Sequence, residues 1–254
     1  MSEAKKPSTE NQMKSTEKWY SSWFDTPYYH ILYKERNYRE AQVFMDNLTH
    51  YLNLPEKATV LDLACGKGRH SIYLNQLGFT VLGADLSENS IAEANKNANE
   101  TLHFKVHDMR EPFEEKFDAI FNLFTSFGYF EDEADNLKTL IAIKDSLSET
   151  GFAVIDFMNV NQVIETLVPE EVKTVDQIDF HIKRYVKEGH IYKEISFQDQ
   201  GQNYHFTEKV RAFSLQDFQE LMDEAGIYLL DIFGDYKLKK FHKTDSERLI
   251  MIFK

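Results

Sequence analysis

The fold of this chain is decided by one stretch, Val60-Leu61-Asp62-Leu63-Ala64-Cys65-Gly66-Lys67-Gly68-Arg69. Its apolar, β-forming first half stops at a glycine-containing turn, and the helix-compatible segment 70–77 follows directly. That order predicts a strand, a tight loop and a helix, the opening of a βαβ unit. Glycine suits the loop because a residue without a Cβ adopts positive φ at little cost and lets a ligand approach the backbone.

The second strand of this unit is predicted over residues 79–84, and Asp85 stands at its carboxyl end. A carboxylate about twenty residues past the loop accepts hydrogen bonds from ribose hydroxyls in nucleotide-binding units. Leu86 follows it and is placed to cover one face of an adenine ring. Together these features predict an adenosine-containing cofactor.

The details of the loop distinguish between cofactors. A dinucleotide fingerprint requires G-x-G-x-x-G, but Ser71 takes the place of the third glycine, and Ala64 or Gly66 that of the first. An acid, Asp62, precedes the loop instead. This pattern resembles the first motif of the Rossmann-like (class I) S-adenosylmethionine-dependent methyltransferases, in which the first glycine is often alanine. The resemblance implies S-adenosylmethionine as cofactor and S-adenosylhomocysteine as product; a nearby carboxylate suits their ammonium and the sulfonium.

The resemblance spans roughly residues 19–160, because further motifs follow in the family's order and spacing. A strand predicted over 102–107 ends in Asp108 and Met109. In the family, the acid at this position accepts a hydrogen bond from the adenine amino group, and the next residue contributes its backbone amide.

The fourth and fifth strands continue the pattern. Residues 116–121 predict a strand that runs into the segment 122–130, which is similar to small-molecule methyltransferases of the sugar-amine and glycine N-methyltransferase groups. A helix over 132–148, a turn at 149–151 and a strand over 152–157 follow. The motifs imply these cofactor-binding residues: Asp62, Ala64, Cys65, Gly66, Gly68, Asp85, Leu86, Asp108, Met109, Leu123 and Phe124.

The segment before the first strand is rich in aromatic residues. Residues 1–17 are polar and predict a disordered tail, whereas residues 18–55 predict a helical lid. In related methyltransferases such a segment supplies tyrosines and a basic residue to the methionine end of the cofactor; the matching residues are Tyr29, Tyr33, Arg36 and Tyr38. Arg36 would pair with the cofactor carboxylate. The alternative is that the lid only packs on the sheet.

Residues 161–213 depart from a plain Rossmann pattern. Alternating segments over 172–186, 191–198 and 203–213 are separated by polar clusters containing Gly189 and Gly201, which predicts an inserted antiparallel β-meander. This insertion would be an acceptor cap at the carboxyl ends of the strands, or a surface for a homodimer.

The remaining residues complete the sheet. Ser214 is the expected N-cap of a helix that Gly226 ends, and strands over 227–233 and 248–253 predict a terminal hairpin. The predicted fold is therefore α/β, with a doubly wound, seven-stranded, mostly parallel Rossmann-like sheet formed by residues 56–160 and 214–254.

Composition excludes several classes of protein. The net charge of −13 over 254 residues, with no basic run longer than Lys237-Leu238-Lys239-Lys240, argues against a nucleic-acid partner. No apolar run is long enough to span a bilayer or to resemble a signal peptide, which predicts a cytoplasmic protein without a membrane partner. Cys65 is the single cysteine and is expected to be a buried loop residue rather than a nucleophile. No Cys/His cluster suggests a metal site.

The predicted reaction is an in-line displacement that methylates nitrogen or oxygen of a small molecule, which mainly requires alignment of the acceptor lone pair. Phe124, Phe127, Tyr129 and Phe130 are expected to form an apolar cup. Two alternatives remain: a protein that binds the cofactor without turnover, and an NAD(P)-dependent oxidoreductase, against which Ser71 argues. The candidate bases are His107, Asp156 and His205, and no catalytic residue is assigned.

Overall fold

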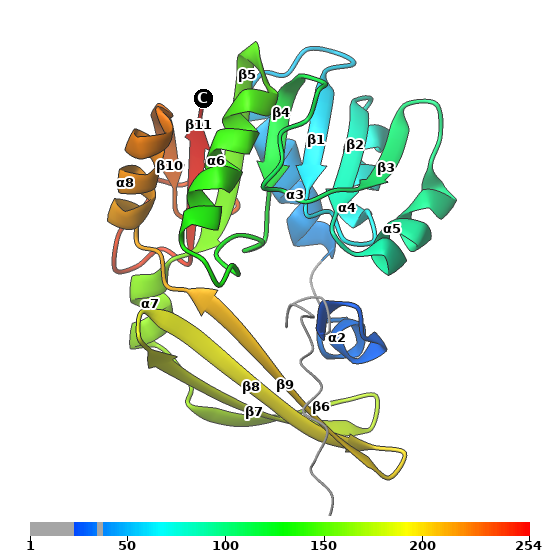
Figure 1. Cartoon of the computed structure of the whole chain (residues 1–254), viewed down its shortest axis with the longest axis vertical. Coiled ribbons are helices and arrows are strands. Elements are labelled where there is room, and N and C mark those ends of the chain that lie inside the picture. Colours follow the sequence, from blue (N-terminus) through cyan, green and yellow to red (C-terminus); the bar gives the residue numbers. More distant parts are fainter. Residues whose placement is uncertain (1–22, 35–37) are drawn as a thin grey trace, which may run out of the picture.

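The computed structural model of this chain describes residues 23–34 and 38–254. Within these residues, seven strands form one sheet in the order β10-β11-β5-β4-β1-β2-β3 (Figure 1). Neighbouring strands are parallel except β11, which is antiparallel to both β5 and β10. The predicted Rossmann-like sheet with a terminal hairpin is thus confirmed. The strands are β1 (Thr59–Leu63), β2 (Thr80–Asp85), β3 (Leu102–Val106), β4 (Phe117–Asn122), β5 (Leu147–Met158), β10 (Leu229–Phe233) and β11 (Arg248–Phe253).

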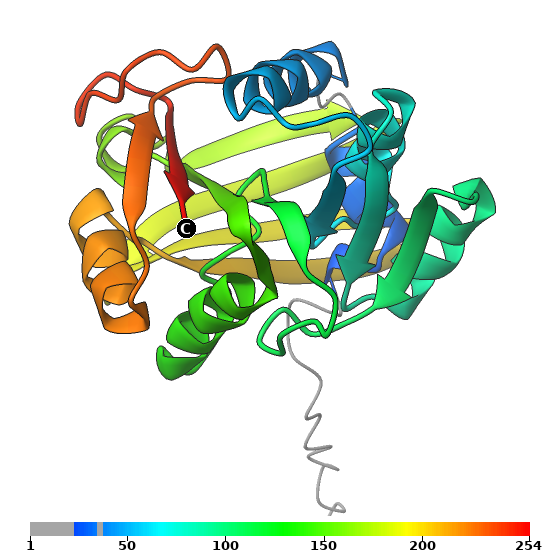
Figure 2. The ribbon, with the colours of Figure 1, turned by 90° about the horizontal axis from the view of Figure 1, so that it is seen from above.

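Helices cover both faces of this sheet (Figure 2). On one face α3 (Tyr38–Tyr51) and α4 (Arg69–Gln76) bury a cluster with β1, β2 and β4, and on the other α6 (Ala134–Ser146) and α8 (Leu215–Ala225) bury a second cluster. The central strands are therefore apolar on both sides, as expected of parallel strands between two helical layers. Helix α5 (Glu88–Ala94) contacts β2 and β3 and continues into the short 3-10 helix η1 (Asn95–Asn97). None of the helices described is long and apolar enough to cross a membrane.

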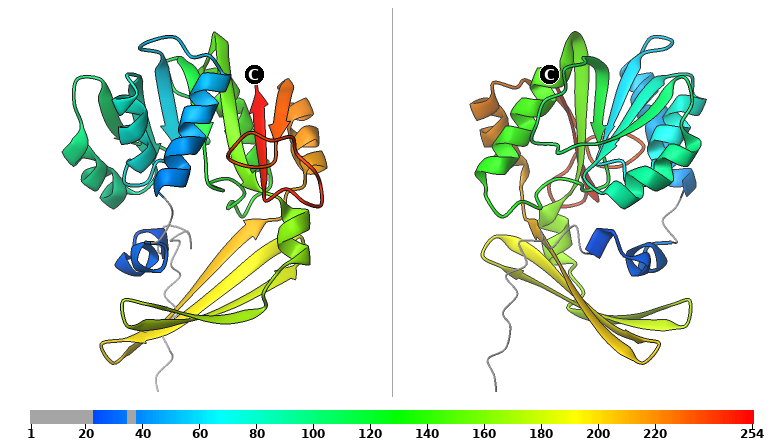
Figure 3. Two further views of the ribbon diagram at one scale, coloured as in Figure 1. Left: turned by 180° about the vertical axis from the view of Figure 1, so that it is seen from behind. Right: turned by 45° about the vertical axis from the view of Figure 1, so that its right-hand side comes forward.

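A second, antiparallel sheet lies beyond the carboxyl ends of the parallel strands (Figures 1 and 3). We call it the cap sheet; it consists of β6 (Glu170–Val175), β7 (Ile178–Lys187), β8 (His190–Asp199) and β9 (Gln202–Arg211). Helix α7 (Val160–Glu165) leads into it from β5. Its inner face buries apolar side chains against Trp23 and the short helix α2 (Pro27–Leu32), which lies between the two sheets.

The cap sheet has one strand more than the sequence predicts. The segment 172–186, predicted as a single strand, is divided into β6 and β7 by a two-residue turn. Asp176 and Gln177 adopt φ of 49° and 67° in this turn, the left-handed geometry of a tight hairpin that glycine or asparagine normally signals. The prediction was wrong because no glycine marks this turn: Asp176 tolerates the left-handed conformation, but Gln177 adopts it only because the two strands pair.

The predicted turn at residues 149–151 is also wrong, because β5 runs without interruption from Leu147 to Met158. In the pairing of β5 with β4, Phe117 is opposite Leu147, whereas Ala119 is already opposite Phe152. The residues of β5 between Leu147 and Phe152 therefore form an irregularity within the strand. Gly151 serves close packing here: an added Cβ would lie 2.6 Å from the carbonyl oxygen of Phe117.

Helix α8 has the predicted ends. The Ser214 hydroxyl accepts a hydrogen bond from the Asp217 amide at 3.3 Å, and Asp217 Oδ2 accepts one from the Ser214 amide at 2.7 Å. This reciprocal pair forms a capping box. Gly226 ends the helix in a left-handed conformation, and Lys144 Nζ of α6 donates to the Ala225 carbonyl oxygen at 2.6 Å.

The capping box gives a test of this local structure. We expect Ser214→Ala to lower the free energy of unfolding by about 1 kcal/mol, because an amide of the first helical turn loses its acceptor. Urea denaturation followed by circular dichroism measures the change. Glu224→Ala, an exposed position on the same helix, is the matched control, and an equal loss in both variants would contradict the capping role.

Candidate active site

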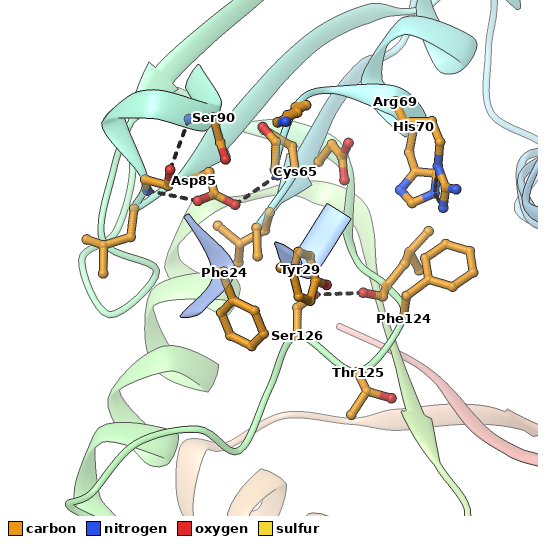
Figure 4. Close-up of a pocket in the computed structure, with 18 of the residues that line it drawn as sticks. Phe24, Tyr29, Cys65, Arg69, His70, Asp85, Ser90, Phe124, Thr125 and Ser126 are labelled. Carbon is orange, nitrogen blue, oxygen red and sulfur yellow. Dashed lines mark hydrogen bonds between the residues drawn. The ribbon is translucent and has the colours of Figure 1, made fainter. Parts of the chain in front are cut away.

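A cavity of about 580 Å³ lies between the carboxyl ends of the parallel strands and the cap sheet. The loops after β1, β2, β3 and β4 form one side of it, and α2 and β9 contribute to the other. Figure 4 shows a close-up of these lining residues. Carboxyl ends of parallel strands are where open α/β sheets bind ligands.

The loop between β1 and α4 turns through three left-handed residues. Ala64, Gly66 and Gly68 have φ of 64°, 55° and 79°. Ala64 therefore adopts the conformation that glycine adopts more easily, at a cost of about 1–2 kcal/mol. At Gly66 an added Cβ would meet no atom within 4 Å, so this backbone is open to a ligand. The Cys65 amide donates to the Ala84 carbonyl oxygen at 3.0 Å and holds the loop against β2.

Asp62, the acid before this loop, is buried and bonded to α4. The Ser71 hydroxyl donates a hydrogen bond to its Oδ2 at 2.6 Å. Burial raises the pKa of Asp62 to about 6, although the hydrogen bond from Ser71 opposes the shift. Ser71, in the place of the third dinucleotide glycine, therefore orients an acid that faces the cavity.

Asp85 at the end of β2 joins two loops. Its Oδ2 accepts a hydrogen bond from the Gly66 amide at 2.8 Å, and its Oδ1 accepts one from the Ser87 amide at 2.8 Å. Burial raises the pKa of its carboxyl group. Each carboxylate oxygen has a further lone pair, so Asp85 can also accept hydrogen bonds from a ligand in the cavity.

The loop after β3 is held by an ionic cluster. Arg110 Nε donates to Asp108 Oδ1 at 2.9 Å, and Arg110 Nη1 donates to Asp135 Oδ2 on α6 at 2.6 Å. Asp108 and the neighbouring Met109 line the cavity. The cluster connects the third loop of the site to the helical layer behind it.

The loop after β4 is strained and is held by side chains from the next two strands of the sheet, β5 and β11. Phe124 and Thr125 have φ of 59° and 60°. The fully buried Asp156 accepts a hydrogen bond from the Phe124 amide at 2.8 Å and from Arg248 Nε at 2.7 Å, while Arg248 Nη2 donates to Thr125 Oγ1 at 2.9 Å. In this conformation the Phe124 ring stacks on His70 at 4.6 Å (Figure 4).

The three candidate bases are placed differently. The His205 ring is bonded to Ser196 on the exposed face of the cap sheet and is not part of the cavity lining. His107 lines the cavity, but its ring lies 3.9 Å from that of Phe113 and its Nε2 is bonded to a backbone carbonyl. Both carboxylate oxygens of Asp156 already accept hydrogen bonds.

The cavity brings most of the predicted cofactor residues together. Gly68 is absent from its lining; an added Cβ there would lie 2.5 Å from Phe104, so this glycine permits close packing of α4 and β3. Arg36 lies outside the described residues. Burial raises the pKa of the Cys65 thiol, which fits a small packed residue. The predicted residues that line the cavity are Tyr33, Tyr38, Asp62, Ala64, Cys65, Gly66, Asp85, Leu86, Asp108, Met109, Leu123 and Phe124.

The cap side of the cavity contains residues that the sequence analysis missed. Glu208 lines the cavity from β9, and Phe24 lines it from the segment before α2. The signal for Glu208 is its position: Phe206 and Val210 lie two residues to either side on the same face of the strand. A carboxylate between two apolar residues on an inward face is unusual and marks a candidate site residue.

Comparisons with known proteins agree with this geometry. A family model described as a methyltransferase domain matches residues 60–151. A glycine/sarcosine N-methyltransferase of Parasynechococcus marenigrum is 31% identical over 199 residues, which cover 74% of this chain and 68% of that protein. A putative methyltransferase of Bacillus subtilis is 27% identical over 77% of this chain and 81% of its own length.

Solved structures share the fold. A methyltransferase from Clostridium acetobutylicum superposes with a TM-score of 0.75 at 23% identity, over 89% of this chain and 95% of that chain. The sugar N-methyltransferase KedS8 from Streptoalloteichus gives a TM-score of 0.68 at 17% identity, over 99% of this chain and 98% of that chain. Family match, sequence similarity, fold and loop geometry thus agree that the chain belongs to the Rossmann-like (class I) S-adenosylmethionine-dependent methyltransferases and uses S-adenosylmethionine as its cofactor.

Proposed function

We propose that this enzyme methylates a small molecule, and that the acceptor atom is an amine nitrogen. The observation that carries the proposal is a cavity with two chemically different sides. One side consists of the β1–α4 loop and the acids at the ends of β1, β2 and β3; the other consists of aromatic rings, the carboxylate of Glu208 and Lys34, which is paired with Asp176. The first side suits a nucleoside attached to an amino acid, and the second suits an uncharged or cationic organic molecule.

The residues around the first side fit the cofactor. Asp85 has lone pairs left for ribose hydroxyls, and the backbone at Gly66 is open. Asp62 faces the cavity beside this loop and would pair with the ammonium of the methionine part. Asp108 and Leu86 would contact the adenine. The cofactor supplies an electrophilic methyl group, so the protein needs only to align the acceptor and exclude water.

Tyr33 and Tyr38 lie where the methionine end of the cofactor is expected. Both line the cavity, and the guanidinium of Arg69 lies 4.8 Å from the centre of the Tyr38 ring. Arg69 also lines the cavity, directly after the glycine loop. We propose that Tyr33 and Tyr38 close this end of the site.

The acceptor is assigned from the second side of the cavity and from relatives. The relatives include enzymes named for glycine, sarcosine and an amino sugar, all of which are amines. The Phe24 ring packs edge to face on Tyr29, with ring centroids 5.0 Å apart, and on Tyr129, with centroids 5.6 Å apart. Such apolar walls favour a reaction in which the positive charge of the sulfonium is dispersed.

We further propose that residues 161–213 act as an acceptor cap. The inner face of the cap sheet packs against α2, and Glu208 on that face lines the cavity. A surface used only for dimerisation would not need to contribute a side chain to the site. A binding protein without turnover likewise has no need for an acceptor side in its cavity.

Cofactor binding is tested by calorimetric titration with S-adenosylmethionine and S-adenosylhomocysteine. We expect both to bind with micromolar affinity and NADH not to bind. Asp85→Ala should weaken binding tenfold or more, because hydrogen bonds to the ribose are lost. Asp231→Ala, which removes an exposed carboxylate bonded to Tyr51 at 2.7 Å, is the control. Binding of NADH alone would overturn the assignment.

Acceptor chemistry is tested by measuring formation of S-adenosylhomocysteine with a panel of acceptors. We expect turnover with at least one of glycine, sarcosine, benzylamine and an amino sugar. The panel also contains a phenol and a carboxylic acid of similar size. Turnover with only these oxygen acceptors would contradict an amine as the acceptor.

The pH dependence of cofactor affinity tests the role of Asp62. Because its pKa is raised to about 6, Asp62 is protonated below this pH and ionised above it. Affinity for S-adenosylmethionine should therefore rise from pH 5 to pH 7, by at most about tenfold per pH unit, as the carboxylate becomes able to pair with the ammonium. Burial is the main cause of the raised pKa; the charge of Asp85 also raises the pKa, and the charge of Arg69 lowers it.

The matched variant is Asp62→Asn, which can still accept the hydrogen bond from Ser71. Its affinity should show no Asp62-dependent rise, so any remaining slope comes from other groups of the cavity such as Asp85, whose pKa is also raised by burial. Identical pH profiles for Asp62→Asn and the wild-type protein would show that Asp62 does not contact the cofactor's charged end.

A further inference from the structure

We propose that Glu208 is the residue that recognises the acceptor: its Oε2 binds the acceptor's amino group and selects amines over neutral molecules. The inference rests on the proposed function, because it concerns the acceptor side of the same cavity. It adds a named recognition group and a charge preference for the ligand, an organic amine that binds as the ammonium cation and loses one proton to water before its nitrogen lone pair attacks the methyl group.

Glu208 is presented to the cavity by the cap sheet. It lies on β9 and is paired in register with Lys193 of β8, on the same inward face as Phe206. Its side chain is 18% exposed and lines the cavity. A carboxylate withdrawn from bulk water to this degree gains strongly from a cationic partner.

The two carboxylate oxygens have different surroundings. Oε1 accepts a hydrogen bond from Trp23 Nε1 at 2.7 Å and from the Tyr33 hydroxyl at 2.8 Å. For Oε2 the hydrogen bonds among the described residues include no donor, and the nearest cation is Lys193 Nζ at 4.0 Å. Two donors therefore fix the orientation of the carboxylate and leave Oε2 able to accept a hydrogen bond from a ligand.

Lys193 contacts both Tyr33 and Glu208. Its Nζ donates to the Tyr33 hydroxyl and lies 4.5 Å from the centre of the Tyr33 ring. The ammonium also forms an ion pair with Glu208 Oε2, at a separation of 4.0 Å that is longer than a hydrogen bond. Tyr33 thus acts as a positioning residue, since it bonds to both Glu208 and Lys193.

Aromatic rings surround the carboxylate. Trp23 packs on Phe206 with ring centroids 4.5 Å apart and on Tyr29 at 5.7 Å, and Phe24 contacts Tyr29 at 5.0 Å. Phe24, Tyr29 and Ser126 of the loop after β4 all line the cavity and are labelled in Figure 4. Ring faces attract organic cations, so the rings and the carboxylate favour the same ligand class.

Three other acids of the cavity also have partners within the protein, and Asp62 is assigned to the ammonium of the cofactor. Asp25 accepts hydrogen bonds from Ser87 Oγ and from Asn89 Nδ2. Asp85 binds two backbone amides, and Asp108 is paired with Arg110. Glu208 also differs in lying on the cap side, opposite the loop that is assigned to the cofactor.

The test uses Trp23 as a reporter, because its indole nitrogen is bonded to Glu208. In a Trp19→Phe background, Trp23 is the single remaining tryptophan of the chain. Protein saturated with S-adenosylhomocysteine is titrated with benzylamine, and with benzyl alcohol as its neutral counterpart, while tryptophan emission is followed. We expect benzylamine to bind at least tenfold more tightly than benzyl alcohol.

Glu208→Gln should abolish this preference, because the amide still accepts the bonds from Trp23 and Tyr33 but carries no charge. The matched control is Glu194→Gln on the neighbouring strand. Glu194 alternates with Lys193 and therefore lies on the outer face of the cap sheet, where it accepts a bond from the Tyr185 hydroxyl at 2.8 Å. This control should bind benzylamine as the wild-type protein does.

Each remaining outcome has a defined meaning. Unchanged benzylamine binding in Glu208→Gln would overturn the assignment of Glu208, and equal binding of the alcohol and the amine would overturn the charge preference. If no protein binds benzylamine while S-adenosylhomocysteine still binds, the recognition proposal fails and the methyltransferase assignment stands. Should Glu208→Gln not fold, Glu208→Asp keeps the charge, shortens the side chain and should retain the preference at reduced affinity.

Discussion

Carboxylates that accept hydrogen bonds from backbone amides hold the loops at the carboxyl edge of the sheet, and the shape of the cavity depends on them. Asp85 binds the amides of Gly66 and Ser87, and Asp156 binds that of Phe124. These amides follow strand ends, where the ladder no longer provides acceptors. Losing such a partner leaves a buried donor unsatisfied, at a cost of about 1–3 kcal/mol. Asp85 thus supports two loops beside the cavity that it also lines, whereas the buried Asp156 only supports the loop after β4.

Strain and unfavourable burial are concentrated around the same cavity. Ala64, Phe124 and Thr125 are left-handed without being glycine, and Asp62 is an acid whose pKa is raised by burial. The surrounding structure compensates for these features through the Asp156–Arg248 ion pair and the Ser71 hydrogen bond. Such local costs are found where a protein must present groups to a ligand in a defined arrangement.

The two sheets contribute different kinds of group. The parallel sheet contributes short loops whose residues are close in sequence, so their geometry follows from local motifs. The cap sheet contributes side chains from one face of an antiparallel meander, and α2 covers the rest of that face. The loops at the strand ends and the cap side of the cavity therefore lie on separate elements, so that one can change while the other is retained.

The sequence by itself determined the parallel strands, the glycine loop, the terminal hairpin and the acids at positions 62, 85 and 108, because each depends on residues near one another in the chain. It did not determine the turn at Asp176–Gln177 or the continuous β5, where strand pairing overrides local preference. Nor did it determine the ion pair of Asp156 with Arg248, which is 92 residues away in the chain, or the hydrogen bond between Trp23 and Glu208, which are 185 residues apart. Only the folded chain brings such residues together, because long-range packing, which no short sequence window contains, decides which distant side chains share a cavity.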